Sequence, residues 1–415
     1  GIFYGGAPGI ADGAIAVGSV DNTHVQQFTF DVAGKLYGYI QAGAAPIAPQ
    51  QGEFELVTYP PGQEIGGVDL PGRPFDGKVV LIFRGSPSFY NTVLAAQNDG
   101  AAGVIIANNP PGTINVSVDG PTPIAIPVVS ITMVDGLALH KAVNEAPADS
   151  PVALTWSDQV LVSEDPVGGD ISSFSSWGVA GDLTLKPDVL APGGNIFSAY
   201  PLDAPDANGS GFASLSGTSM AAPHVAGAVA LLLNVNPDLS PVDVRALLQN
   251  NANPVDNHKV SVVGTWLPEA VFRQGAGLIN IPASLTKATS GRQGATAAAS
   301  LVTPSKINLL DGDKIETTNL TITNNMDHDV TYTLTLDDSP LTVYGRNKDS
   351  NTKTQIPIEI AQVTDFSMKK ITVPAYSSRT VAITINEPLK YWSGDAVKPG
   401  TFYGGYVVLT GSDNT

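Results

Sequence analysis

The sequence predicts an α/β protein that ends in an antiparallel β-sandwich, and two patterns carry this prediction. Over residues 77–143, short apolar runs typical of buried strands alternate with segments typical of helices. Beyond about residue 290 the helical signal ends, and short runs of alternating polar and apolar residues follow one another between turns, as in an antiparallel sandwich. A chain of 415 residues is long enough for about two to four domains.

The first half of the chain contains an expected α/β module. A buried strand is expected ahead of it at residues 14–20, which read AIAVGSV. Because strand and helix alternate inside the module, we expect a compact unit inserted between its neighbours. The expected strands of the module are 77–83, 103–109 and 126–132, and its expected helices are 88–100 and 134–143.

The longest predicted helix begins at Ser219. Pro223 stands in its first turn, where the missing N–H costs nothing. Its residues are apolar on nearly every side, which predicts burial in the centre of a domain. A second helix is predicted to begin after Ser240 as N-cap, with Pro241 at the first helical position and Asp243 completing a capping box.

The composition restricts the classes of partner. Hydrophobic residues make up 43% of the chain and charged residues 14%, which suits a well-packed globular protein. The formal net charge is −17, and nucleic acids and anionic membranes both require a basic surface, so neither is an expected partner. The longest apolar run, residues 226–233, is too short to span a bilayer. Cysteine is absent, which excludes disulfides and thiolate chemistry.

Three Asn-x-Ser/Thr sequons begin at Asn115, Asn208 and Asn319, and they are predicted glycosylation sites for a eukaryotic secretory pathway. No signal peptide is visible, and the chain begins at Gly1 without an initiator Met. We therefore expect a processed product of a secreted, extracellular protein.

The segment LSGTSMAAPHVAG, residues 215–227, carries the strongest expectation of chemistry. Ser219 stands at the start of the long helix, where its hydroxyl can project into a cleft while its backbone N–H points the same way. The helix N-terminus adds a partial positive charge that favours an oxyanion. Gly217, just before the serine, leaves room for a substrate carbonyl. The alternative role for Ser219 is that of a helix cap.

Residues 217–227, GTSMAAPHVAG, resemble the nucleophile signature of the subtilisin-like serine proteases. The resemblance implies an α/β fold with a doubly wound, mostly parallel sheet, and Ser219 as the catalytic nucleophile of an endopeptidase acting on proteins or peptides. Calcium is implied by this resemblance alone, because no carboxylates cluster with calcium-loop spacing and no metal ligand is evident. Four flanking segments resemble parts of the same family in the same order, at residues 14–22, 171–178, 185–196 and 275–284.

The expected domain order rests on two further resemblances. Residues 35–162, with the cues GKVVLIFRG, AAQNDGAAGVIIANN and IPVVSIT, resemble the protease-associated domain that large subtilases carry as an insertion. Residues 290–415 resemble the fibronectin-III-like sandwich of the same multidomain enzymes. The predicted domains are therefore a first catalytic segment at 1–34, the insertion at 35–162, a second catalytic segment at 163–289, and the sandwich at 290–415.

The partners of Ser219 are missing from the expected site. In the family the base lies in an H-G-T motif, the orienting acid in a D-T-G or D-x-G motif, and an oxyanion-hole asparagine in an A-G-N segment, and no such motif precedes Ser219 here. His224 lies five residues after Ser219, about 7.5 Å and more than one turn along a helix, so the two side chains point different ways. We expect His224 to be a packed, hydrogen-bonded core histidine.

Two interpretations follow from the missing groups. In one, an N-terminal fragment of the same protease, carrying the Asp, the His and the Asn, stays bound as a separate chain, because a doubly wound sheet shares its core across a cut in an exposed loop. In the other, the chain is an isolated inactive fragment, which would expose a sheet edge and an apolar face. We favour the first. The alternative function is that of a catalytically retired subtilase serving as a binding, adhesion or storage protein.

Substrate contacts are expected on two segments. Gly5, Gly6 and Ala7 align with the base of the family's primary specificity pocket and would leave it open to a bulky apolar side chain. The alternative for these residues is a glycine-rich surface turn. Ser214 and Leu215, just before the nucleophile segment, can pair with the backbone of a substrate as an added strand.

Overall fold

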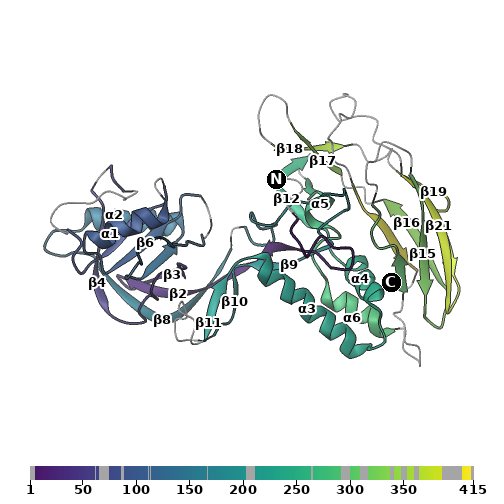
Figure 1. The fold of residues 1–415 in the computed structure, drawn as a ribbon, viewed down its shortest axis with the longest axis horizontal. Coiled ribbons are helices and arrows are strands. Elements are labelled where there is room, and N and C mark those ends of the chain that lie inside the picture. The colour runs from purple at the N-terminus through teal and green to yellow at the C-terminus, as the bar shows by residue number, and fades with distance from the viewer. Residues whose placement is uncertain are drawn as a thin grey trace. The chain divides into compact units, whose positions relative to one another are not determined.

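The protein was analysed as a computed structural model, which divides into two compact units (Figure 1). Unit 1 comprises Gly1–Val20, Gly169–Gly194 and Gly217–Thr415, and unit 2 comprises Asp21–Gly168 and Asn195–Ser216. The structure describes residues 5–60, 62–64, 74–85, 88–110, 112, 114–165, 167–201, 211–262, 265–290, 300–308, 316–336, 341–346, 353–358, 364–385 and 404–412.

Unit 2 is built on a closed barrel with the strand order β2-β3-β7-β6-β5-β4-β8. The neighbours from β4 to β7 are parallel, whereas every pairing that involves β2, β3 or β8 is antiparallel. The strands are β2 (His24–Val32), β3 (Lys35–Gln41), β4 (Glu53–Thr58), β5 (Val79–Phe83), β6 (Gly103–Ala107), β7 (Val128–Ile131) and β8 (Ala153–Glu164).

Two helices, α1 (Phe89–Asn98) and α2 (Met133–Glu145), pack on this barrel (Figure 1). Alternate residues of β5 face two different cores, because successive side chains of a strand point to opposite faces. Leu81 lies in the core that α2 joins, and Ile82 lies in the core that α1 joins. These elements confirm the strands and helices predicted over residues 77–143.

Unit 2 is larger than the predicted insertion. β2 pairs with both β3 and β8, so the barrel takes in chain before the expected start at residue 35 and beyond the expected end at 162. The unit also includes a ribbon of two antiparallel strands, β10 (Ile196–Ala199) and β11 (Phe212–Leu215). Pairing between strands far apart in the chain leaves no local sequence signal, which explains the different boundaries.

In unit 1, the region around Ser219 consists of helices packed on a short sheet. β1 (Val17–Asp21) pairs with β9 (Val189–Gly194) in a two-stranded sheet, and the doubly wound, mostly parallel arrangement stays a prediction. One apolar core joins β9 to three of the helices (Figure 1). The helices of this part are α3 (Thr218–Val235), α4 (Pro241–Asn250), the four-residue α5 (Val271–Gln274) and α6 (Ile281–Ser290).

The start of α4 confirms the predicted capping box. Ser240 Oγ accepts a hydrogen bond from Asp243 N at 3.2 Å, and Asp243 Oδ2 accepts one from Ser240 N at 3.0 Å. Two backbone N–H groups that the first turn leaves without helical partners are thereby satisfied.

α3 confirms the predicted long helix but not its predicted burial. Two apolar side chains that flank its buried face on either side are exposed, Leu231 to 48% and Leu233 to 37%. α3 is long and apolar enough to cross a membrane, but core helices of soluble proteins also meet these two criteria. When the sequence of a helix is apolar on every side, the pattern alone does not show which side is left without a packing neighbour. The buried face consists of Ala221, Val225, Ala228 and Leu232.

The C-terminal part of unit 1 is built from antiparallel sheets, one of order β14-β15-β21-β19 and one of order β20-β16-β22. The two sheets share one core, in which Ile322 of β15 and Tyr332 of β16 both lie. Beyond residue 290 the part of the chain that the structure describes contains no helix. The strands of these sheets and of the hairpins β12–β13 and β17–β18 are β12 (Asp256–Val262), β13 (Thr265–Pro268), β14 (Ser300–Thr303), β15 (Glu316–Asn324), β16 (Val330–Leu336), β17 (Leu341–Arg346), β18 (Lys353–Ile358), β19 (Thr364–Phe366), β20 (Lys370–Val373), β21 (Ser377–Ile385) and β22 (Val407–Gly411).

Candidate active site

Ser219 lies exposed in the first turn of α3. The N-cap of this helix is Gly217, and no side chain caps it, so the alternative role of Ser219 as a helix cap is wrong. The Ser219 hydroxyl makes no hydrogen bond with any residue that the structure describes. It is therefore available for another role.

The backbone around Ser219 leaves a donor free at the helix N-terminus. Gly217 N donates to Gly193 O at 2.7 Å, and Met220 N donates to Gly217 O at 2.9 Å. For the Ser219 N–H the described residues provide no acceptor. A free N–H beside the partial positive charge of the helix N-terminus can stabilise an oxyanion formed next to the Ser219 hydroxyl.

Gly193 allows β9 to pass directly beneath this turn. A Cβ atom at Gly193 would lie 2.4 Å from Ser19 Oγ, 2.7 Å from Gly217 O and 2.9 Å from Ala221 Cβ. Only a glycine fits such a contact without displacing the start of α3. The sequence analysis did not single out Gly193, although it lies in the LKPDVLAPGGNI segment that carries part of the family resemblance.

Asp188, which immediately precedes β9, is a fully buried carboxylate. Its Oδ2 accepts hydrogen bonds from Ala16 N and Lys186 Nζ, both at 2.8 Å, and its Oδ1 accepts one from Lys306 Nζ at 2.6 Å. Burial alone would raise the pKa of Asp188, but the hydrogen bonds from both lysines and from Ala16 outweigh it and hold this pKa below its ordinary value. The ionised carboxylate fixes the start of the strand that leads to Gly193.

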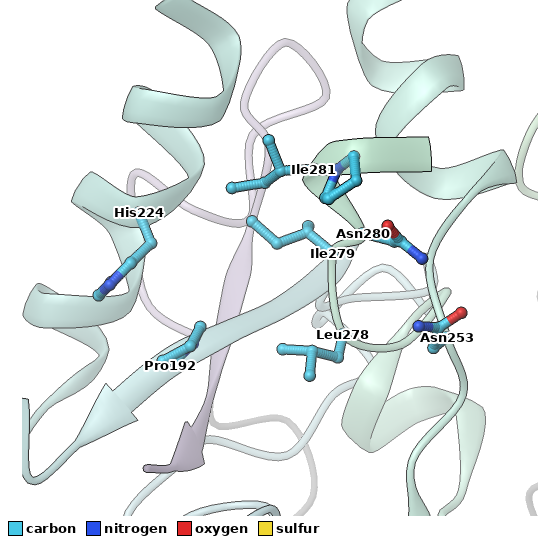
Figure 2. Close-up of a pocket in the computed structure, with 8 residues that line it drawn as sticks. Pro192, His224, Asn253, Leu278, Ile279, Asn280 and Ile281 are labelled. Carbon is cyan, nitrogen blue, oxygen red and sulfur yellow. The ribbon is translucent and has the colours of Figure 1, made fainter. Parts of the chain in front are cut away.

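His224 differs in part from its prediction. It is hydrogen-bonded as expected, with Nδ1 2.9 Å from Met220 O, but it is half-buried and lines a pocket instead of lying in the core. Since a carbonyl oxygen can only accept, Nδ1 carries a proton in this contact. His224 of α3 is one of the residues that line this pocket of about 390 Å³ (Figure 2). The pocket is lined by Pro192, His224, Asn253, Leu278, Ile279, Asn280, Ile281 and Pro282.

The other four histidines have partners of their own. Their contacts do not bring an imidazole to Ser219 among the described residues. His258 and Asp170 form a close hydrogen-bonded pair, the arrangement of a base and its orienting acid, but in the part of the chain that the structure describes neither is hydrogen-bonded to Ser219. The remaining pairs are His24 with Thr23, His140 with Asn144, and His328 with Asp327.

The segment expected to form the primary specificity pocket is a turn near the start of unit 1. Gly5 is half-buried, and Gly6 and Ala7 are exposed. Ile10 N donates to Gly6 O at 3.3 Å, which closes the turn. The described contacts of these three residues do not include Ser219, so their role as a pocket floor stays a prediction.

Ser214 and Leu215 lie half-buried in β11, where β10 pairs with one edge of the strand. The other edge of β11 has no strand partner among the described residues. Pairing of Ser214 and Leu215 with a substrate backbone along that edge stays a prediction.

Of the three sequons, Asn115 and Asn319 have exposed side chains, and Asn208 lies outside the described residues. The described residues also contain no group of three or more His, Cys, Asp or Glu side chains that could hold a metal ion. Calcium therefore stays an expectation from the family resemblance alone.

Comparison with known proteins extends over almost the whole chain. Residues 4–277 match the model of the subtilase family, and residues 306–415 match the model of an Fn3-like domain. The minor extracellular protease Vpr of Bacillus subtilis (strain 168) is 32% identical over 251 residues, covering 60% of this chain and 29% of Vpr. The PI-type proteinase of Lactococcus lactis subsp. cremoris is 27% identical over 444 residues, covering 99% of this chain and 22% of that proteinase.

Among solved structures, the psychrophilic subtilisin-like protease Apa1 from Pseudoalteromonas sp. AS-11 matches 70% of this chain and 63% of its own, with 19% identity and a TM-score of 0.33. The chain spans less than a third of the length of the two curated relatives, at 29% and 22%. The family match over residues 4–277 covers more than half of the chain and includes Ser219, Gly193 and Asp188. The chain therefore belongs to the subtilase family.

Proposed function

We propose that this chain is the nucleophile-bearing, C-terminal portion of a secreted subtilisin-like serine endopeptidase. The observation that carries the proposal is the exposed Ser219 hydroxyl at the N-terminus of α3, free of hydrogen bonds to described residues and next to its own free N–H. Vpr and the PI-type proteinase, to which this chain is similar, are both named as proteases and Vpr as an extracellular one, which agrees with this function.

The proposed reaction uses both groups of Ser219. The hydroxyl oxygen attacks the scissile carbonyl carbon and passes its proton to a general base. The carbonyl oxygen becomes an oxyanion, which accepts a hydrogen bond from the Ser219 N–H at the positive end of α3. The leaving amine takes the proton, and water then hydrolyses the acyl-enzyme.

The base, its orienting carboxylate and the asparagine donor come, in this proposal, from an N-terminal portion of the same protease bound as a separate chain. The 415 residues carry no H-G-T motif. The apolar surface that α3 exposes, with Leu231 and Leu233 on the two sides of its buried face, supports the presence of a covering partner, because soluble proteins rarely leave large apolar patches in water. The apolar pocket beside His224 lies next to the same helix and offers further surface for the companion.

We assign the substrate contacts to the predicted segments. Gly5, Gly6 and Ala7 would form an open floor for a bulky apolar side chain. Ser214 and Leu215 would pair with the substrate backbone along the free edge of β11. Gly217 leaves space for the scissile carbonyl. The substrates are proteins or peptides.

We also propose that unit 2 is a protease-associated domain that gates the cleft or binds substrate. The sequence cues of residues 35–162 and the α/β barrel that they form support this assignment. Glycosylation at the exposed Asn115 and Asn319, and at Asn208, would follow from passage through a eukaryotic secretory pathway.

The test is labelling of the native protein with a fluorophosphonate probe, followed by denaturing gel analysis and intact-mass measurement. Such a probe reacts with a serine only where a base and an oxyanion hole activate it. We expect one label, on Ser219, and a second polypeptide that carries the H-G-T motif. Ser219→Ala should abolish labelling.

Ser240→Ala is the matched control, because Ser240 also stands at a helix N-terminus but engages its hydroxyl in a capping box. It should lower the free energy of unfolding by about 1 kcal/mol and leave the labelling intact. A companion chain without labelling would point to a retired enzyme that serves in binding, adhesion or storage. Labelling of the isolated 415-residue chain would contradict the proposed companion.

A further inference from the structure

The chain passes between the two units four times, and we number these passages in chain order: after Val20, Gly168, Gly194 and Ser216. A hydrogen-bond network in unit 2 lies next to them in the sequence. Asp165 is its centre and is only 8% exposed. Asp165 N donates to Thr23 O at 2.9 Å, which ties the second passage to the first. Asp165 Oδ1 accepts from Val167 N at 3.1 Å, and Asp165 Oδ2 accepts from Asn195 Nδ2 at 2.7 Å. The same carboxylate thereby holds the third passage.

Asn195 extends the network to the fourth passage. Its backbone N donates to Ser216 Oγ at 2.8 Å, and Ser216 Oγ lies 3.4 Å from Asn195 Oδ1, to which it donates. Asn195 has a φ of 57°, in the left-handed region that side chains other than those of Asn and Asp rarely adopt. The side-chain amide of Asn195 donates a hydrogen bond through Nδ2 and accepts one through Oδ1. These two bonds explain why an asparagine stands where the backbone conformation alone would favour glycine.

The ribbon between Asn195 and Ser216 is anchored in unit 2 at a further point. Phe197 of β10 and Phe212 of β11 stack with ring centroids 5.6 Å apart. Phe197 also meets Phe28 of the barrel edge-on at 6.2 Å. The ribbon therefore belongs to unit 2 through aromatic contacts as well as through the hydrogen bonds at its base.

Each end of this ribbon is joined by one peptide bond to a residue of the candidate active-site region in unit 1. Ser216 precedes Gly217, the N-cap of α3, and Asn195 follows Gly194 at the end of β9. Within unit 1, Gly217 N donates to Gly193 O, so the two ends meet again just before Ser219. Whatever fixes the base of the ribbon restrains the backbone three residues ahead of the nucleophile.

We propose that Asp165, Asn195 and Ser216 form a clamp that positions Ser219, which makes unit 2 a positioning element of the hydrolysis as well as an accessory domain. This inference rests on the proposed function. The clamp residues act through the chain that they hold and do not touch the substrate. Loss of the clamp should loosen the first turn of α3 and misplace the Ser219 hydroxyl and N–H without removing them.

The decisive variant is Asn195→Gly in the native protein, because glycine keeps the left-handed backbone and removes only the amide. With a small peptide substrate, kcat should fall roughly 10- to 100-fold, as expected for a small misplacement of reacting groups, while KM stays within about twofold. Ser216→Ala should act in the same direction, and Ser216→Thr, which keeps the hydroxyl, should restore most of kcat.

Asn108→Ala is the matched control. Asn108 is also a buried asparagine of unit 2, where its Nδ2 donates to Gly112 O and its Oδ1 accepts from Arg84 Nη1, but it follows β6 and makes none of the hydrogen bonds of the clamp. It should lower the stability of unit 2 and leave kcat unchanged. An equal fall of kcat in Asn108→Ala and Asn195→Gly would overturn the clamp, because general destabilisation would then explain both.

Hydrogen exchange separates this inference from the proposed function. Asn195→Gly should speed exchange of the Gly217 amide, which donates to Gly193 O, and of the Met220 amide, which donates to Gly217 O, whether or not the protein hydrolyses peptides. Faster exchange in a protein without peptidase activity would support the clamp and overturn the proposed function. Normal exchange and normal kcat in Asn195→Gly, in a protein that does hydrolyse peptides, would overturn the clamp alone.

Discussion

At the scale of single residues, a side chain at position 193 would occupy the space between β9 and the first turn of α3. Gly193→Ala places a methyl group within 3 Å of Ser19 Oγ, Gly217 O and Ala221 Cβ. Because two of these atoms belong to the turn that carries Ser219, we expect fluorophosphonate labelling to slow by roughly tenfold or more. The free energy of unfolding should fall by about 1–3 kcal/mol, the usual cost of overpacking.

Gly227→Ala provides the matched control for Gly193→Ala. A Cβ at Gly227 meets no atom within 4 Å, and the residue lies inside α3. Alanine there should raise the free energy of unfolding by about 0.5–1 kcal/mol, because it favours the helix. Labelling of Ser219 should not change. Equal labelling rates in both variants would contradict the importance that we give to the Gly193 contact.

The buried carboxylate of Asp188 should make the free energy of unfolding depend on pH. Its pKa in the folded protein lies below the ordinary value of 3.8, because hydrogen bonds from Lys186, Lys306 and Ala16 favour the ionised form more than burial disfavours it. A group with a lowered folded pKa contributes stability that is present above the unfolded pKa and is lost as the pH falls through the folded one. The contribution of Asp188 should therefore be complete at pH 5 and decline below about pH 4.

Urea unfolding between pH 5 and pH 2.5 tests this prediction. Asp188→Asn should be less stable than the wild type at pH 5, because it leaves the buried Lys186 and the half-buried Lys306 without their carboxylate. The difference between the two proteins should shrink as the pH falls. Parallel stability curves over this range would show that Asp188 does not titrate as proposed.

At the scale of elements, α3 has one face in the core and one apolar face in solvent. Leu231 and Leu232 are neighbours in sequence but lie on different faces, with exposures of 48% and 1%. Leu232→Ala should cost about 2–5 kcal/mol of stability, because it opens a cavity in the core. Leu231→Glu should change the free energy of unfolding by less than about 0.5 kcal/mol. It should nevertheless weaken binding of the companion chain, so that less of the companion co-elutes with this chain in size-exclusion chromatography.

Val162→Glu is the control for Leu231→Glu. Val162 is 54% exposed on β8 of unit 2, so a glutamate there also replaces an exposed apolar side chain. It should leave the companion bound. If Leu231→Glu and Val162→Glu retain the companion equally well, the exposed face of α3 is not where the companion binds.

The elements show what a sequence can predict. The helix starting near Ser219 and the capping box of Ser240 and Asp243 were predictable, because propensity and caps are local. The extent of unit 2, the Gly193 contact and the Asp165–Asn195 hydrogen bond were not, because they join residues that are distant in the chain. Ser219 could be predicted as a nucleophile because the residues around it form one contiguous motif that resembles the signature of the family. The half-exposure of α3 was missed because an apolar pattern does not reveal which neighbours are present.

At the scale of the whole molecule, residues 304–308 attach the antiparallel sheets to the rest of unit 1. We call this segment the strap. Lys306 Nζ donates to Asp188 Oδ1 at 2.6 Å and to Leu185 O at 2.8 Å. Ser305 Oγ donates to Gln249 Oε1 at 2.5 Å, and Asn308 Oδ1 accepts from Leu185 N at 2.8 Å. The strap therefore reaches the buried carboxylate that fixes the start of β9.

The strap predicts that the antiparallel sheets and the helices around Ser219 unfold together. Calorimetry of the native protein should show one transition for unit 1, and Lys306→Met should separate or broaden it and lower stability by about 3 kcal/mol, because a buried ion pair loses one partner. Lys141→Met is the control, since the Lys141 side chain is 73% exposed and should matter little. Separate transitions in the wild type would mean that the C-terminal sheets are an independent module. If the wild type shows one transition and Lys306→Met splits or broadens it, then residues far beyond Ser219 in the sequence help to hold the fold around Ser219.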